Sequence, residues 1–274
     1  MTEWDAPGYA RIAELQEAMA AEALSLLDLK GTERVLDLGC GNGKVTAEIA
    51  ARVPGGTVVG VDSSANMIAY AADHFGPAAR PNLRFETEDI RSLPFREEFD
   101  LVVSFNALHW IPEQDQALRS IHAALKPNGL AQLRLVPTGK RKSIENVIEE
   151  TRLSPKWAGY FREFHDPYLH LTPEQYCAMA ERNHLDVRCI HTKDKAWDFK
   201  SGEAFIAFSL VGMVEWTKLL PERDRLAFVT EVLDRYRSQA CERPGEENTF
   251  KFYQMDVTLS RCSSTPETTR AGCR

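Results

Sequence analysis

The sequence predicts an α/β protein whose sheet is mostly parallel and is covered by helices on both faces. Short apolar segments alternate with amphipathic segments between Arg34 and Val136, and this alternation is typical of β-α-β units. The chain has 274 residues, of which 43% are hydrophobic and 27% are charged, so it can bury the core of a large globular domain. Polar residues also follow the apolar segments where parallel strands would end.

The first elements follow from hydrophobic spacing and from the residues that stop each segment. Apolar side chains at helical spacing predict an amphipathic helix over residues 11–29, before Gly31. The segments with the composition of buried strands are residues 34–39, 57–62, 82–89, 99–106 and 130–136. The helical segments between them are residues 44–53, 64–75, with Ser63 or Ser64 as N-cap, and 115–125.

The alternation stops after the fifth strand and resumes near the C-terminus. Residues 138–185 have a mostly helical pattern with an irregular aromatic stretch, which predicts a helical cap inserted after the fifth strand. Residues 186–199 and 249–261 predict two further strands. A helical stretch from Ser201 to Ala240, interrupted at Pro221, separates these two strands. The sequence therefore predicts a sheet of seven strands.

Composition disfavours several classes of function. A net charge of −7 and a pI near 5.6 disfavour a nucleic-acid partner, because phosphate binding needs a positive surface. No segment has the pattern of a secretion signal or the length of a membrane span, so we expect a cytoplasmic monomer or homodimer with no membrane partner. The six cysteines form no CxxC pair, and we expect reduced thiols and no metal site.

A glycine loop lies between the first strand and the helix that follows it. The segment from Arg34 to Ala50 reads RVLDLGCGNGKVTAEIA, with glycines at Gly39, Gly41 and Gly43. Such a loop presents backbone N–H groups and the positive end of a helix dipole to a ligand. The dinucleotide fingerprint GxGxxG would place its third glycine where Lys44 stands, so the spacing disfavours a nicotinamide cofactor. Taken alone, the loop is also compatible with a tight turn that binds nothing.

Polar residues at the ends of the other strands support a ligand site. Asp62 ends the second strand, where a carboxylate can accept hydrogen bonds from both hydroxyls of a ribose. Asp89 ends the third strand beside Ile90, in position for an adenine amino group, and Asn106 ends the fourth. Open α/β sheets bind ligands at the carboxyl ends of their strands, so these loops predict one shared site.

Together these motifs resemble the class I S-adenosylmethionine-dependent methyltransferases. The resemblance is carried by Asp37 before the glycines, by GVDSS on the second strand and by EDI on the third, and it covers residues 34–136. It implies a Rossmann-like sheet and S-adenosylmethionine as cofactor. Gly39, Cys40 and Gly41 would line its methionine moiety. The cofactor-binding residues that the resemblance implies are Asp37, Gly39, Cys40, Gly41, Gly43, Asp62, Ser63, Asp89, Ile90 and Asn106.

A finer resemblance concerns the methyl acceptor. The segments SFNALHWIPEQDQAL and GYARIAELQ are similar to the trans-aconitate and juvenile-hormone-acid methyltransferases, and LHW is similar to the malonyl-carrier-protein methyltransferases. All of these methylate carboxylates, so the resemblance implies O-methylation of a small-molecule acid. A carboxylate is ionised at neutral pH and needs hydrogen-bond donors, not a general base. We expect Gln16 and the indole of Trp110 to supply them, with Tyr9 and His109 beside them.

Other interpretations stay open at this point. If the acceptor were a hydroxyl, a carbon or a nitrogen of a specialised metabolite, His109 would be the natural base. The chain could also be a non-catalytic module that binds the cofactor. Aromatic residues of the predicted cap, such as Trp157, Phe161 and Tyr168, and the later segment EAFIAFSLVGMVEW favour an apolar pocket and a hydrophobic acid. A small tricarboxylate would instead need converging arginines, for which the candidates are Arg134, Arg152 and Arg162.

These expectations divide the chain into five parts. The first is a helix that covers the site, the second is the cofactor-binding core, and the third is the helical cap. The remaining two are the rest of the sheet with its helices and a polar, aperiodic tail that we expect to be disordered. Their bounds are residues 1–30, 31–137, 138–185, 186–261 and 262–274.

Overall fold

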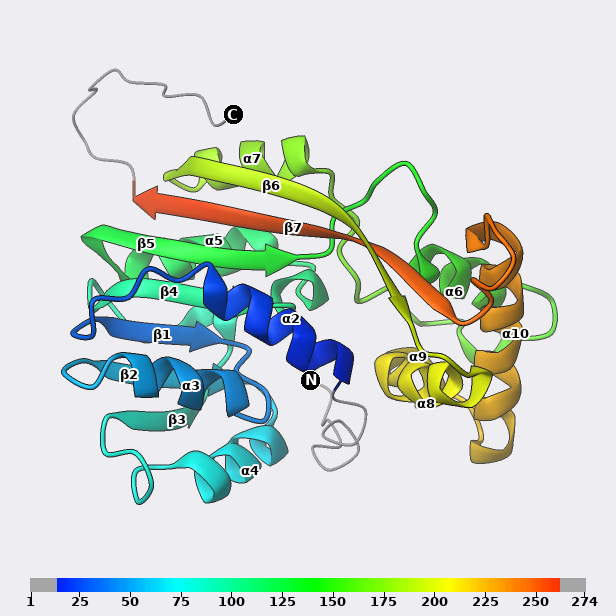
Figure 1. Cartoon of the computed structure of the whole chain (residues 1–274). Coiled ribbons are helices and arrows are strands. Elements are labelled where there is room, and N and C mark those ends of the chain that lie inside the picture. Colours follow the sequence, from blue (N-terminus) through cyan, green and yellow to red (C-terminus); the bar gives the residue numbers. More distant parts are fainter. Residues whose placement is uncertain (1–13, 262–274) are drawn as a thin grey trace.

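The computed structural model describes residues 14–261 (Figure 1), without the side chains of residues 14, 16 and 17. Three predictions therefore cannot be compared with it. Tyr9 and the tail 262–274 lie outside the described residues, and of Gln16 only the backbone is described, within the first helix α2.

The described residues form the predicted seven-stranded, mostly parallel sheet. The strand order is β3-β2-β1-β4-β5-β7-β6, and β7 runs in the opposite direction to the other six strands. Four consecutive residues of β1 are buried, as expected for a parallel strand covered on both faces. The strands are β1 Arg34–Leu38, β2 Thr57–Asp62, β3 Leu83–Thr87, β4 Phe99–Phe105, β5 Leu125–Leu135, β6 Leu185–Asp198 and β7 Thr249–Arg261.

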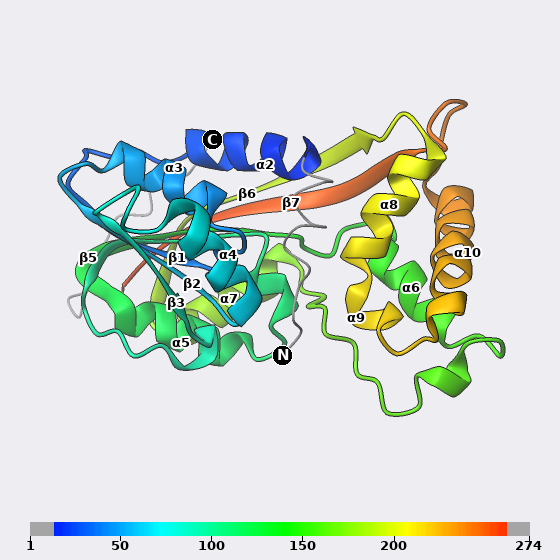
Figure 2. The same cartoon turned by 90° about the horizontal axis from the view of Figure 1, so that it is seen from below.

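Helices cover both faces of the sheet, as Figure 2 shows. On one face, Leu24 and Ala47 belong to an apolar cluster with Val35 and Val58 of the strands. On the other face, Ile121 and Tyr176 belong to the largest cluster of the core. The helices of the first face are α2 Glu14–Ser25, α3 Lys44–Arg52 and α4 Ala65–Phe75, and those of the second are α5 Gln114–Ala124 and α7 Pro173–Arg182.

Local sequence signals set several helix boundaries. Ser64 is the N-cap of α4, where its hydroxyl accepts a hydrogen bond from the backbone N–H of Met67. Thr172 and Gln175 form a capping box at the start of α7, next to Pro173. In the described part of the chain, no helix combines the length and the apolarity that a membrane crossing requires.

The last two strands extend beyond the sheet as a ribbon. β6 and β7 pair from Leu185–Arg261 to Asp198–Thr249, whereas β5 pairs with β7 only through residues 255–260. The outer half of the pair therefore leaves the sheet as a two-stranded ribbon that carries the following helices (Figures 1 and 2).

These helices and an earlier segment form one cap, which differs from the predicted insertion 138–185. The cap consists of residues 144–168 and 202–240, which share a single apolar cluster that includes Val147, Trp216 and Phe228. In contrast, α7 packs against α5 and β6 and belongs to the core. The cap elements are α6 Ile144–Arg152, η3 Ala158–Tyr160, α8 Gly202–Gly212, α9 Val214–Thr217 and α10 Glu222–Ala240.

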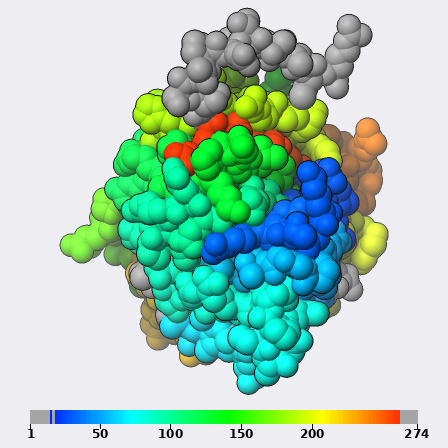
Figure 3. Space-filling view, turned by 90° about the vertical axis from the view of Figure 1, so that its left-hand side faces the viewer, coloured from blue at the N-terminus to red at the C-terminus, as the bar shows by residue number. Residues whose placement is uncertain are grey.

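The parallel strands point their carboxyl ends toward the cap (Figure 1). The short 3-10 helices η1 Ile90–Ser92 and η2 Leu108–Trp110 follow β3 and β4 at this end. Figure 3 shows the opposite end of the molecule, where core elements from α2 to β7 make up most of the face. The loops that bear the predicted site residues therefore lie between the core and the cap.

A buried guanidinium joins β5, β7 and α2. Arg134 is 0% exposed, and its Nε and Nη2 donate to the two carboxylate oxygens of Asp256 at 2.7 and 3.1 Å. Its Nη1 donates to the carbonyl oxygen of Met19 on α2 at 2.8 Å. The bidentate geometry and the third bond satisfy this charge inside the protein, which is the condition for burying it.

A second set of charges holds α2 against the ribbon. The Glu22 carboxylate accepts hydrogen bonds from Lys193 and Lys195 of β6 at 2.8 and 3.0 Å. Burial would raise the pKa of Glu22, but these ammonium groups, with Gln254 and Arg134, lower it to about 2. The first helix is thus anchored by charged contacts to the last two strands.

We expect Arg134→Met to lower the free energy of unfolding by about 3–5 kcal/mol, because it leaves Asp256 buried without its partner. The double variant Arg134→Met/Asp256→Leu should recover at least half of that loss. Urea unfolding measures both. Arg182→Met is the matched control, since Arg182 forms an exposed pair with Asp115 and should cost less than about 1 kcal/mol. An equally small loss for Arg134→Met would contradict the role given to the buried pair.

Candidate functional site

The glycine loop has the backbone geometry that its residues require. Gly39, Gly41 and Gly43 all have positive φ, at 70°, 54° and 80°. A Cβ on Gly39 would lie 2.2 Å from the Cβ of Ala107, whereas a Cβ on Gly41 would meet no atom within 4 Å. Gly39 therefore permits close packing of two loops, and Gly41 faces open space. The loop is fixed to β2 by the N–H groups of Gly39 and Cys40, which donate to the Val61 carbonyl at 2.8 and 3.0 Å.

Asp62 is held in a fixed orientation beside this loop. Its carboxylate accepts the N–H of Gly41 at 3.0 Å and the N–H of Ser64 at 2.9 Å. Ser63, between them in the chain, also lines the cavity described below. This placement at the end of β2 is the one expected of a carboxylate that binds a ribose.

Asp89 lies at the end of β3 and is already paired. Arg91 donates to it through Nη2 at 2.7 Å and through Nε at 3.0 Å, which lowers the pKa of the Asp89 carboxyl. Arg91 also donates to Glu113 at 3.2 Å. Asp89 is therefore a fixed anion, and Ile90 offers an apolar surface next to it.

Two ionisable groups in and next to the glycine loop, the carboxyl group of Asp37 and the thiol of Cys40, are buried. Asp37 is 3% exposed, and burial raises the pKa of its carboxyl to about 7, although the Thr46 hydroxyl donates to it at 2.7 Å. Burial also raises the pKa of the Cys40 thiol well above its usual range, with the nearby Asp37 and Asp62 adding to the shift. A thiolate nucleophile at Cys40 is therefore disfavoured.

Asn106 follows β4 in a left-handed conformation, with φ of 61°. Its N–H donates to the Arg134 carbonyl at 3.0 Å, which connects the loop to β5. The side-chain oxygen of Asn106 is buried and has no hydrogen-bond partner among the described residues. Buried polar atoms are normally paired, so this oxygen is suited to a donor on a ligand.

Apart from Gly43, the predicted cofactor-binding residues border one cavity of about 850 Å³ between the core and the cap. Gly43 does not line it, and a Cβ there would lie 2.6 Å from the Cβ of Ala71, so this glycine serves the packing of the loop. The core side contains the glycine loop and the ends of β2, β3 and β4, and α2 contributes Leu15 and Met19. The cap side is largely apolar. Its lining residues include Ile144, Glu145, Ile148, Tyr168, Phe208, Ser209, Met213 and Trp216. The volume is in the range of ligand and cofactor sites.

His109 and Trp110 occupy the boundary between the two sides, on η2. Trp110 packs edge-on against Tyr168 and Trp216, with ring centroids 5.1 and 6.0 Å apart. The Val136 N–H donates to Nδ1 of His109 at 3.4 Å, so the neutral ring carries its proton on Nε2. His109 is 4% exposed, and burial lowers its pKa to about 3.

Two residues expected to bind the acceptor lie elsewhere. Trp157 and Phe161 are each 3% exposed and pack against Phe228 of α10, in the interior of the cap. The Trp157 indole N–H donates to Glu231 at 3.0 Å. Neither side chain lines the cavity, so their assignment to the acceptor site is wrong. Their aromatic character serves the packing of the cap.

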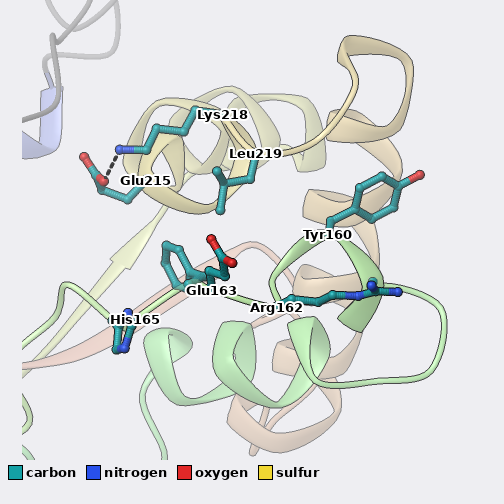
Figure 4. Close-up of a pocket in the computed structure, with 9 residues that line it drawn as sticks. Tyr160, Arg162, Glu163, His165, Glu215, Lys218 and Leu219 are labelled. Atoms are coloured by element: carbon teal, nitrogen blue, oxygen red, sulfur yellow. Dashed lines mark hydrogen bonds and ion pairs between the residues drawn. The ribbon is translucent and has the colours of Figure 1, made fainter.

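The three candidate arginines do not converge. Arg134 is paired with Asp256 inside the sheet, and Arg152 is paired with Glu149 and lies over the ring of Phe164. Arg162 lines a second cavity, of about 580 Å³, on the cap (Figure 4). Glu215 and Lys218 border both cavities and form an ion pair with each other. Among the described residues, no arginine lines the cap side of the large cavity.

Sequence reasoning missed Ile144, Glu145 and Ile148 of α6, which line the cavity. Tyr168 and the segment EAFIAFSLVGMVEW, which contains Phe208, Ser209 and Trp216, were among the residues that predicted an apolar pocket. Tyr168 lies beside His109 because the N–H of Leu169 donates to the His109 carbonyl at 2.8 Å. Phe208, Ser209 and Trp216 come from α8 and α9, more than 90 residues after η2 in the chain. No local pattern signals such contacts, although the apolar composition of α8 indicated burial.

The hydrogen-bond acceptors on the core side fit S-adenosylmethionine. Asp62 and Asp89 are fixed anions at neighbouring strand ends, Gly41 leaves open space, and the unpartnered oxygen of Asn106 can accept from a ligand. These groups match a ligand with ribose hydroxyls, an adenine amino group and a cationic centre.

Comparisons with known proteins agree with this assignment. Residues 35–129 match the family model described as a methyltransferase domain. Trans-aconitate 2-methyltransferase of Deinococcus radiodurans is 31% identical over 268 residues, which are 94% of this chain and 98% of that protein. Such similarity along nearly the whole chain shows a family relationship.

Two solved structures share the fold. The YcgJ protein of Bacillus subtilis matches with a TM-score of 0.65 and 19% identity, over 90% of this chain and 100% of that one. Phosphoethanolamine N-methyltransferase 2 of Haemonchus contortus, in complex with S-adenosylmethionine, matches with a TM-score of 0.61 and 18% identity, over 94% of this chain and 57% of that one. With the glycine loop and the strand-end carboxylates, these findings identify the chain as an enzyme of the class I S-adenosylmethionine-dependent methyltransferase family.

Proposed function

We propose that this methyltransferase transfers the methyl group to the carboxylate of a small acid with an apolar body. The observation that carries the proposal is the wall around Trp110, where neutral hydrogen-bond donors meet an apolar, aromatic surface. The relatives named as trans-aconitate 2-methyltransferases support a carboxylate as the acceptor group.

The site residues suit an acceptor that needs no deprotonation. When bound, S-adenosylmethionine supplies a methyl group that is already activated by the positive charge on sulfur. A carboxylate is ionised at neutral pH, so the protein has to orient one of its oxygens and exclude water. The indole of Trp110 and the Nε2–H of His109 are donors of the required kind, and Gln16 stays a further candidate on α2.

The state of His109 disfavours a general-base mechanism. Its Nδ1 accepts the Val136 N–H, and burial lowers its pKa to about 3. A base with so low a pKa takes a proton from a hydroxyl poorly. The structure of η2 therefore favours an acceptor that is already anionic over an alcohol.

The walls of the cavity favour an apolar acid over a tricarboxylate. Several carboxylates on one small molecule need several cations around them. On the cap side, the cation among the described lining residues is Lys218, and it is paired with Glu215. The surrounding side chains, such as Ile148, Phe208 and Met213, provide apolar surface.

Labelled S-adenosylmethionine should give base-labile methyl esters with straight-chain monocarboxylates of about six to twelve carbons. We expect their kcat/KM to exceed that of trans-aconitate at least about tenfold, because the cavity lacks converging arginines. Alcohols and amines of matched length serve as controls and should stay unlabelled. Preferred transfer to an alcohol, to an amine or to the tricarboxylate would refute the proposal.

His109→Gln should lower kcat/KM less than about tenfold, because glutamine keeps a donor and one hydrogen bond contributes about 0.5–1.5 kcal/mol. The pKa of His109 is about 3, so it is neutral throughout pH 6–9 and its ionisation cannot shape the rate in that range. The pH profiles of the variant and the wild type should therefore run parallel. A general base would instead give a loss of about 10²–10⁴ and a changed profile.

A further inference from the structure

The cap side of the cavity carries an excess of negative charge. Two carboxyl groups, Glu145 and Asp166, face one imidazole, that of His170. His170 is hydrogen-bonded to Asp166, with its Nε2 2.8 Å from a carboxylate oxygen, and it offsets the charge of Glu145 only from a longer range. The other charges on this wall, Lys218 and Glu215, cancel each other. Among the described residues on this wall, two carboxyl groups therefore share one imidazole, and Glu145 has no ion-pair partner of its own.

Glu145 is the group that faces the cavity. It lies in the first turn of α6, is half-buried and lines the cavity. Burial raises the pKa of its carboxyl, although a hydrogen bond with Ser143 and its own backbone N–H act in the other direction. The ion pairs of the described part of the chain do not include Glu145. A carboxyl group in an apolar cavity without a cation is costly to ionise unless a ligand supplies the partner.

Ser209 gives an independent observation on the same side. It lies on α8, is 2% exposed and lines the cavity. Its hydroxyl oxygen has no hydrogen-bond partner among the described residues, which is uncommon for a buried hydroxyl. A carboxylate accepts hydrogen bonds, and the hydroxyl oxygen of a serine can accept them as well as donate its own proton. The cap wall therefore offers two acceptors where an entirely apolar ligand would leave them unpaired.

We propose that Glu145, with Ser209, recognises an ammonium group at the far end of the acceptor. The inference rests on the proposed function and narrows the substrate class to amino acids in the broad sense. Such a molecule has a carboxylate that is methylated, an apolar middle and a distal amine. An ammonium group carries one positive charge and several N–H donors, so it matches one carboxylate and one hydroxyl oxygen. A distal carboxylate would meet like charge at the same place and is selected against.

The test measures acceptor binding by calorimetry to the full chain saturated with S-adenosylhomocysteine, which lacks the charged sulfur. The probes are straight-chain ω-amino acids of four to ten carbons and the unsubstituted acids of equal length. We expect the ω-amino acid of the best length to bind at least about tenfold more tightly than the unsubstituted acid of the same length. This factor is at the lower end of the coupling energies of close charge pairs. Glu145→Gln should abolish this preference. Glu150→Gln is the control, since Glu150 lies on the same helix but pairs with the exposed Lys142.

Each possible result tests a different part of the proposal. If the unsubstituted acids are bound and methylated as well as the amino acids, the ammonium site is refuted and carboxylate methylation stands. If the preference persists in Glu145→Gln, Glu145 is not its source. If Glu145→Gln weakens the binding of S-adenosylmethionine far more than that of S-adenosylhomocysteine, the carboxylate interacts with the positive charge of the cofactor. That result also refutes the inference. If no acid is bound or methylated, the proposed function itself fails.

Discussion

The position of the site depends on the bidentate contact between Arg134 and Asp256 inside the sheet. This contact joins directly opposite residues of the antiparallel strands β5 and β7, and the third hydrogen bond of Arg134 reaches α2. Because β7 also pairs with β6, the same contact ties the ribbon that carries the cap to the core of the sheet. Helix α2 and the ribbon that carries the cap are therefore both connected to one buried guanidinium. An unpaired charge at this buried position would be costly.

The cavity follows from how these parts meet. Parallel strands bring Asp62, Asp89 and Asn106 to one edge, and the ribbon places the cap opposite that edge. The two sides differ in chemistry. The core side offers fixed anions and backbone N–H groups, whereas the described cap side is largely apolar and carries the carboxyl group of Glu145 and the Glu215–Lys218 pair. A cofactor that is polar and an acceptor that is largely apolar can thus occupy one space, with Trp110 and His109 between them.

The core and the cofactor loop could be predicted from the sequence because their signals are local. The glycine spacing, the residues after each strand and the alternation of strands and helices all lie within about 100 residues. The cap could not be predicted in the same way. Aromatic residues indicate burial but not which surface they bury, so Trp157 and Phe161 were assigned to a cavity that Phe208 and Trp216 line. Arg134 was a candidate for binding the methyl acceptor because the sequence does not reveal its partner Asp256, which lies 122 positions later.

The most direct test of this account is a crystal structure of the chain with S-adenosylhomocysteine and a six-carbon ω-amino acid. We expect the nucleoside at Asp62 and Asp89, the acid's carboxylate beside Trp110 and His109, and its amine at Glu145. That arrangement would confirm that one cavity between the core and the cap holds both reactants in line. An acid bound with its carboxylate away from Trp110, or in the second cavity on the cap, which Arg162 lines, would contradict the account.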